Sequence, residues 1–164
     1  MSKGPGDAGV EASGAALGEE QATVAVVAEL LESNSATLVA SLSSTQVAAA
    51  LWSIKDRALK CWMSDTPTAL RCEAVAATLL AAKPSVEAEG IANWISGFAR
   101  LTQGQMEDAV RHLDVAYQRL TASGHPLPAA QSQLPRFIAL SMLGKSDLAV
   151  QCAERTHAEL VVLG

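Results

Sequence analysis

The chain has 164 residues, of which 31 are alanine and 20 leucine, against four isoleucines and six aromatic residues. Because sheets need β-branched and aromatic side chains while alanine and leucine favour helices, this composition excludes an all-β fold and predicts an all-α one. The hydrophobic fraction of 49% excludes disorder over the whole length. The net charge of −5 lies in residues 1–34, which contain six acidic residues and one basic residue, so the remainder of the chain is neutral. A nucleic-acid-binding protein needs a cluster of positive charge, which this balance argues against.

The sequence predicts a cytoplasmic protein that does not enter a membrane. No apolar run approaches the roughly 20 residues that cross a bilayer. The first residues lack the apolar segment of a secretory signal. Three cysteines are too few and too scattered for a disulfide framework, which favours a reducing compartment.

The N-terminal quarter divides into a tail and a cap. Residues 1–18 hold five of the 11 glycines and no apolar period, which predicts a flexible tail. Over residues 19–44, apolar side chains at steps of three and four predict two capping helices, with a break at Ser33 and Asn34. Ser43 and Ser44 are then suited to cap the helix that follows.

From residue 45 onward, helical patterns alternate with short breaks. Pro135 lies inside the fifth of these patterns, residues 128–143. A proline within a helix removes a backbone N–H donor and here clashes with the carbonyl of Gln131, at a cost of about 3 kcal/mol. We therefore expect that helix either to begin after Pro135 or to kink there, and we expect a turn over 125–128. The predicted helices span 45–62, 66–82, 84–103, 106–122 and 128–143, and a last one starts at 146. They pair into three hairpins, over 45–83, 84–124 and 125–164.

Small residues recur in this part of the chain every 40 positions. Gly104 and Gly144 share this interval, as do Ala69, Ala109 and Ala149. A small residue where two helices cross lets their backbones approach closely, and a period in this range is typical of stacked helical hairpins. The spacing therefore predicts an α-solenoid.

The pattern resembles the tetratricopeptide repeat family over about 45–164. The third unit departs from the family at Phe137, where a small residue is expected, and the first unit matches only in its second helix. The resemblance implies a right-handed superhelix whose first helices line a concave groove that holds a partner peptide or helix. The middle unit carries the match best, through Gly97, Gly104, Ala109, Leu113 and Ala116.

A narrower resemblance concerns residues 125–154. This stretch is similar to helical repeats that precede caspase-like, CHAT-type peptidase domains in bacterial proteins, and to repeats of large bacterial transcriptional regulators. In both families the repeats sense or bind, and another domain provides the output. This resemblance implies a regulatory module.

No pattern in the sequence predicts catalysis, a metal or a cofactor. His112 and Cys152 occupy equivalent positions of adjacent units, but no glycine-rich loop or oxyanion site accompanies them. The histidines and cysteines lack metal-ligand spacing, and no phosphate-binding glycine motif occurs. We therefore expect a protein that is not an enzyme.

The candidate binding residues lie on the first helix of each unit. Ile91, Trp94 and Phe98 fall on one stripe of a helix, which is either core or the lining of the groove. Tryptophan and arginine anchor interfaces more often than other residues. The predicted partner-binding residues are Lys55, Trp62, Trp94, Phe98, Arg100, Leu101, Gln131 and Leu134.

Two functions remain open at this stage. In the first, the chain binds a partner segment, or an effector domain of its own parent protein, in the groove. In the second, it is a structural module that forms homo-oligomers through its apolar C-terminal end, which has the sequence ELVVLG.

Overall fold

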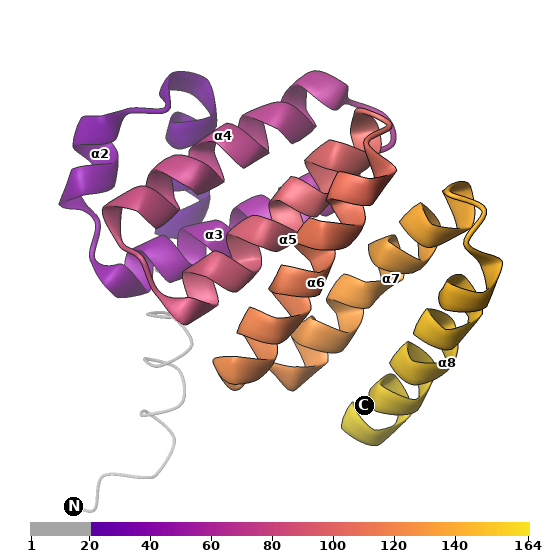
Figure 1. Cartoon of the computed structure of the whole chain (residues 1–164). Helices are drawn as coiled ribbons and strands as arrows, with labels where there is room; N and C mark the ends of the chain where they lie inside the picture. The colour runs from indigo at the N-terminus through magenta and orange to yellow at the C-terminus, as the bar shows by residue number, and fades with distance from the viewer. Residues whose placement is uncertain (1–20) are drawn as a thin grey trace, which may run out of the picture.

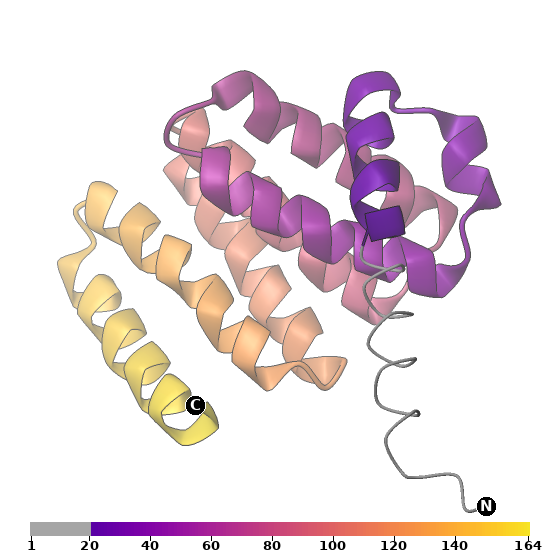
Figure 2. The same cartoon turned by 180° about the vertical axis from the view of Figure 1, so that it is seen from behind.

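The computed structural model describes residues 21–164, which form helices joined by short turns and contain no strand (Figures 1 and 2). The tail predicted over 1–18 lies outside the described residues. Residues 21–33 form an N-terminal helix. It is followed by α2 (Ala36–Ser41), α3 (Ser44–Cys61), α4 (Thr66–Ala82), α5 (Val86–Thr102), α6 (Met106–Ala122), α7 (Pro126–Met142) and α8 (Ser146–Leu163).

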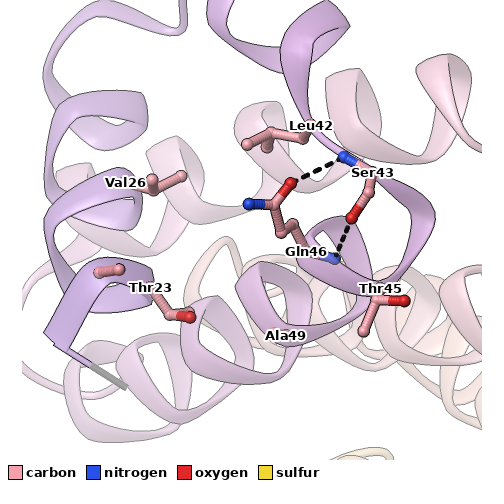
Figure 3. A pocket seen from close by; sticks show the side chains of 8 residues that line it. Thr23, Val26, Leu42, Ser43, Thr45, Gln46 and Ala49 are labelled. Carbon is pink, nitrogen blue, oxygen red and sulfur yellow. Dashed lines mark hydrogen bonds between the residues drawn. The ribbon is translucent and has the colours of Figure 1, made fainter. Parts of the chain in front are cut away.

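Side-chain caps fix where several helices begin. Ser43 caps α3 as predicted: its hydroxyl accepts from the amide of Gln46 at 3.2 Å, and the Gln46 side chain accepts from the amide of Ser43 at 2.9 Å (Figure 3). This reciprocal pair satisfies two amides that have no partner within the helix. Asp65 caps α4 and Ser85 caps α5 in the simpler one-bond form.

Glycines end three of the helices in one conformation. Gly104, Gly124 and Gly144 have φ values of +72°, +82° and +70°. Glycine adopts this left-handed region without the steric cost that a Cβ brings. The turns after α5, α6 and α7 therefore share one geometry, and each sends the chain back along the preceding helix (Figure 1).

Neighbouring helices pack in series. Each of α3 to α7 packs against the next helix along the chain, and α3 also contacts α5, which contacts α7. At the N-terminal end, the Arg71 guanidinium on α4 donates to the carbonyls of Leu31 and Glu32, at 2.7 and 3.1 Å. The prediction of an all-α fold is confirmed for the described residues, and the packing of neighbouring helices in series is consistent with an all-α helical repeat.

Helices α5 and α6 approach each other closely at two glycines of α5. A Cβ added to Gly97 would lie 2.6 Å from the Cγ and Cδ2 atoms of Leu113, and one added to Gly90 would lie 2.9 Å from the Cγ of Leu120. Both leucines are fully buried. The leucine side chains of α6 therefore pack directly against the α5 backbone at these two glycines.

Helix α7 differs from its prediction. It begins at Pro126, so the turn expected over 125–128 is wrong, and it continues through Pro135, so a start after Pro135 is also wrong. Pro126 occupies the first helical position, where a missing amide costs nothing. Pro135 cannot donate to the Gln131 carbonyl; Gln131 is an exposed residue, whereas Pro135 is buried. A kink at Pro135 stays a prediction.

Candidate partner-binding surface

The aromatic stripe of α5 lies in the core. Trp94, Phe98 and Leu101 are buried, and the Trp94 and Phe98 rings stack with centroids 6.4 Å apart. Trp62, which is half-buried at the end of α3, also stacks on Phe98, with ring centroids 6.1 Å apart. Because α3 packs over this side of α5, the three buried side chains are closed to a partner, and the core interpretation is favoured over the groove interpretation.

Lys55 is also held inside the fold. Its Nζ lies 5.6 Å from the ring centroid of Trp52 and 4.9 Å from that of Trp94, and it pairs with Asp56. A cation over two indole faces is attracted by both ring quadrupoles. Lys55 therefore joins α3 to α5 and does not project towards a partner.

Trp52, Glu87 and His125 extend this cluster, and the sequence did not single them out. The Trp52 indole N–H donates to Glu87 Oε1 at 2.8 Å, and His125 Nε2 lies 3.4 Å from the same oxygen. These residues come from α3, α5 and the turn before α7. Their association depends on tertiary packing, which no local sequence pattern marks.

Arg100 projects from a different side of α5. Its guanidinium binds both carboxylate oxygens of Glu73 at 2.6 Å, which braces α5 against α4. It also lines a polar pocket of about 300 Å³ together with His112 and Asn93. Burial, followed by the charge of Arg100, lowers the pKa of His112, whose Nδ1 lies 2.9 Å from Asn93 Oδ1. The pocket therefore holds an imidazole whose neutral form is favoured, beside an arginine whose guanidinium is already paired with Glu73.

Gln131 and Leu134 are the two predicted residues that are exposed, and both lie on α7. The Leu134 side chain is 50% exposed, and Met142 on the same helix is 64% exposed. Phe137, which the sequence marked as a departure from the repeat pattern, is exposed beside Leu134. We refer to the following set as the α7 stripe: Leu127, Gln131, Leu134, Phe137, Ile138 and Met142.

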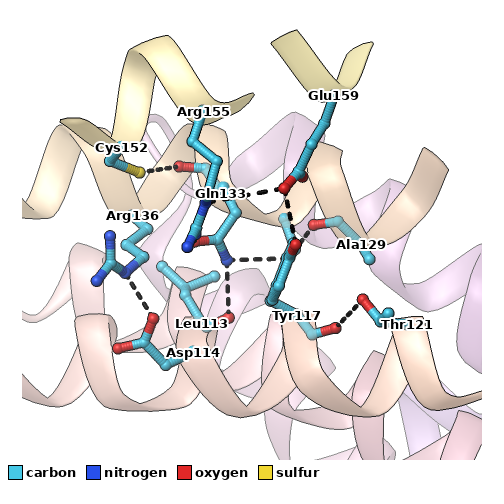
Figure 4. A network of polar contacts seen from close by, with 11 residues as sticks. Leu113, Asp114, Tyr117, Thr121, Ala129, Gln133, Arg136, Cys152, Arg155 and Glu159 are labelled. Atoms are coloured by element: carbon cyan, nitrogen blue, oxygen red, sulfur yellow. Dashed lines mark hydrogen bonds and ion pairs between the residues drawn. The ribbon is translucent and has the colours of Figure 1, made fainter. Parts of the chain in front are cut away.

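The opposite face of α7 is fixed by a buried polar network (Figure 4). The fully buried Gln133 donates from Nε2 to the Leu113 carbonyl at 3.1 Å and accepts from Arg155 Nη2 at 3.0 Å. Arg136 Nε lies 2.6 Å from Asp114 Oδ1. These polar contacts join α7 to α6 and α8 and restrict the rotation of α7 about its axis. They therefore hold the α7 stripe towards solvent.

Helix α8 carries a second group of exposed apolar side chains. Val162, at 84% exposed, and Val161 lie in its last turn, and Leu148 and Val150 lie near its start. The inner face of α8 is narrow, with Ala149, Cys152 and Thr156 buried. We refer to Leu148, Val150, Val161, Val162 and Leu163 as the exposed α8 residues.

Three further features of the described chain bear on a functional site: a pocket, possible metal ligands and possible membrane-spanning helices. A pocket of about 440 Å³ between the N-terminal helix and the start of α3 is lined by small, apolar and polar side chains, Val26, Ser43 and Gln46 among them (Figure 3). Within residues 21–164, no group of three or more potential metal ligands occurs. No described helix is long and apolar enough to cross a bilayer.

Comparisons with protein-family models, with curated proteins and with solved structures found no match to this chain. The resemblance to tetratricopeptide repeats therefore depends on the residues and spacings given above.

Proposed function

We propose that this chain is a non-catalytic protein-interaction module that binds an amphipathic helix of a partner protein on the α7 stripe. The observation that carries this proposal is the exposure of Leu127, Leu134, Phe137 and Met142 along one helix whose opposite face is fixed. Contiguous exposed apolar side chains on a folded protein commonly mark an interaction site.

The spacing of the α7 stripe suits a helical partner. Leu127, Gln131, Leu134 and Ile138 follow steps of four, three and four, so they line one side of a helix. On α5, the stripe of Ile91, Trp94 and Phe98 has the same kind of spacing and is covered by α3. No helix of the described chain covers the α7 stripe in this way, and helix-in-groove recognition uses anchors at these intervals.

The architecture that we infer around this surface is a tetratricopeptide-like solenoid with three hairpins and a right-handed superhelix. Its support is the packing of each helix on the next, together with the contacts that α5 makes with α3 and α7. The resemblance of 125–154 extends the proposal to a cytoplasmic regulatory role. The partner is then an effector domain of the same parent protein, such as a CHAT-type peptidase, or the output domain of a transcriptional regulator.

Selection from a library of helical peptides tests this proposal, because the partner need not be identified first. The whole chain is immobilised and probed with the library displayed on phage. We expect enrichment of amphipathic helices, with binding lost in Leu134→Asp and kept in Arg111→Asp, which alters an exposed side chain of α6. No enrichment, or equal loss in both variants, would contradict the proposal.

A second function, self-association, is supported by the exposed α8 residues. Val161 and Val162 are exposed in the last turn, where a second copy could cover them. Sedimentation equilibrium of the chain and of Val162→Asp distinguishes the two functions. A dimer that Val162→Asp dissociates supports oligomerisation through α8, whereas a monomer at high concentration excludes it.

A further inference from the structure

Helices α6 and α8 occupy equivalent positions in two successive hairpins. Helix α8 begins 40 residues after α6, and α7 begins 40 residues after α5. Ala109 and Ala116 are buried on α6, and the residues 40 positions later, Ala149 and Thr156, are buried on α8. The two helices therefore turn the same face towards the first helix of their own hairpin.

A second face of α6 is covered by α7. The Leu113 carbonyl accepts from Gln133 Nε2 at 3.1 Å, and Arg136 Nε lies 2.6 Å from Asp114 Oδ1. Val110, on the same side of α6, packs against buried residues of α7 and α8. This face of α6 therefore combines apolar contact with one carboxylate that binds an arginine of the following helix.

The equivalent positions of α8 are more exposed. The fully buried Leu113 corresponds to Ala153, which is half-buried, and the half-buried Asp114 corresponds to Glu154, which is exposed. Val150 is 54% exposed, whereas its equivalent on α6 is half-buried. Helix α8 is the last helix of the series, so no further helix of the chain follows it there (Figure 1). We refer to the following set as the α8 docking surface: Val150, Ala153, Glu154 and His157.

We propose that the α8 docking surface binds one helix of a partner protein, and that this helix is amphipathic and carries an arginine. It packs on α8 as α7 packs on α6, with its apolar side chains on Val150 and Ala153 and its arginine beside Glu154. None of these residues belongs to the α7 stripe, so the inference goes beyond the proposed function and does not depend on it.

Charge complementarity identifies the occupant. Arg136 of α7 pairs with Asp114 of α6, and Arg100 of α5 binds both carboxylate oxygens of Glu73 on α4. In both contacts, an arginine of the following helix meets a carboxylate of the preceding one, which is a strong and directional pairing. Glu154 makes the same kind of carboxylate available on α8, where it is exposed.

Phage selection against a chain whose α7 stripe is disabled tests the partner. The Leu134→Asp chain is immobilised and probed with a displayed library of helical peptides. We expect enrichment of amphipathic helices with a recurrent arginine, whose binding falls about fivefold or more in Leu134→Asp with Glu154→Arg. Glu107→Arg, which reverses an exposed carboxylate at the start of α6, is the matched control and should leave binding unchanged. No enrichment, helices without the arginine, or equal loss in both variants would contradict the proposal.

Extension of the chain by one hairpin tests the geometry. Gly164 lies 40 residues after Gly124, so a second copy of residues 125–164 can follow it with the native connection and no linker. We expect the added hairpin to fold on α8 and to slow amide hydrogen exchange at Ala153 about tenfold relative to the parent chain. Unchanged exchange in the extended chain would overturn the assignment of this surface.

A charge swap in the extended chain isolates the ion pair. Glu154→Arg should remove the added protection, and Arg136→Glu in the added copy should restore it. Loss without restoration would show that the pair is wrong. Sedimentation equilibrium of the parent chain then separates a partner helix from a second copy, because a dimer that Glu154→Arg dissociates would make a second copy the occupant and contradict the proposal.

Discussion

Substitution of Gly97 by alanine tests the packing of α5 on α6. The glycine has ordinary helical backbone angles, so alanine alone would favour the helix by about 1 kcal/mol. The added Cβ would nevertheless lie 2.6 Å from two side-chain carbons of Leu113, where ordinary carbon contacts are about 3.5–4.0 Å. Helix α6, or the Leu113 side chain, must therefore move by about 1 Å.

The size of the loss follows from how little Leu113 can move. Its side chain is fully buried, and its carbonyl is held by Gln133. Overpacking of this kind costs about 1–3 kcal/mol, and the gain in helix propensity offsets part of it. We expect Gly97→Ala to lower the free energy of unfolding by about 1–2 kcal/mol.

Urea unfolding followed by circular dichroism at 222 nm measures this change, and a double-mutant cycle isolates its cause. Leu113→Ala alone should cost about 2–5 kcal/mol through the cavity that it leaves. In that background Gly97→Ala should become stabilising, because the clash has gone and the propensity gain of about 1 kcal/mol remains. If Gly97→Ala stabilises the parent chain as well, the close approach of α5 and α6 is wrong.

Three further substitutions test other parts of the structure. Gly104→Ala meets no atom within 4 Å but keeps a φ of +72°, so it should cost about 1 kcal/mol from backbone conformation alone, measured by urea unfolding. Gln133→Leu removes the donor to the buried Leu113 carbonyl and the acceptor of Arg155 Nη2, and it should cost about 1–2 kcal/mol in the same assay; an unchanged midpoint would refute the role of the network. The pKa of His112 is lower in the folded chain than its ordinary value of 6.5, so the imidazole of the unfolded chain binds a proton first as the pH falls. Stability that is present above pH 6.5 is therefore lost as the pH falls below that value. His112→Gln should flatten that part of the thermal stability profile against pH, and an unchanged slope would contradict the assignment.

The helix boundaries could be predicted because local chemistry sets them. Ser43 caps α3, and Gly104 and Gly144 end α5 and α7, each for a reason that a few neighbouring residues supply. Helix α7 was predicted less well, since a proline lowers helix propensity wherever it stands. Whether a helix tolerates Pro135 depends on whether the freed Gln131 carbonyl meets water, which is a tertiary property.

The candidate site was harder to predict for a related reason. An apolar stripe at helical spacing looks the same whether a neighbouring helix or a partner covers it. Trp94 and Phe98 are covered by α3, whereas Leu134 is not covered by any described helix.

Nuclear magnetic resonance mapping with a peptide from the phage selection tests the central claim most directly. The labelled chain is titrated with the peptide, and amide shifts are followed along the helices. The proposal predicts that the largest shifts fall on α7 around Leu127, Leu134 and Ile138, and that Leu134→Asp abolishes them. Shifts confined to α8, or to the pocket beside the N-terminal helix, would contradict it.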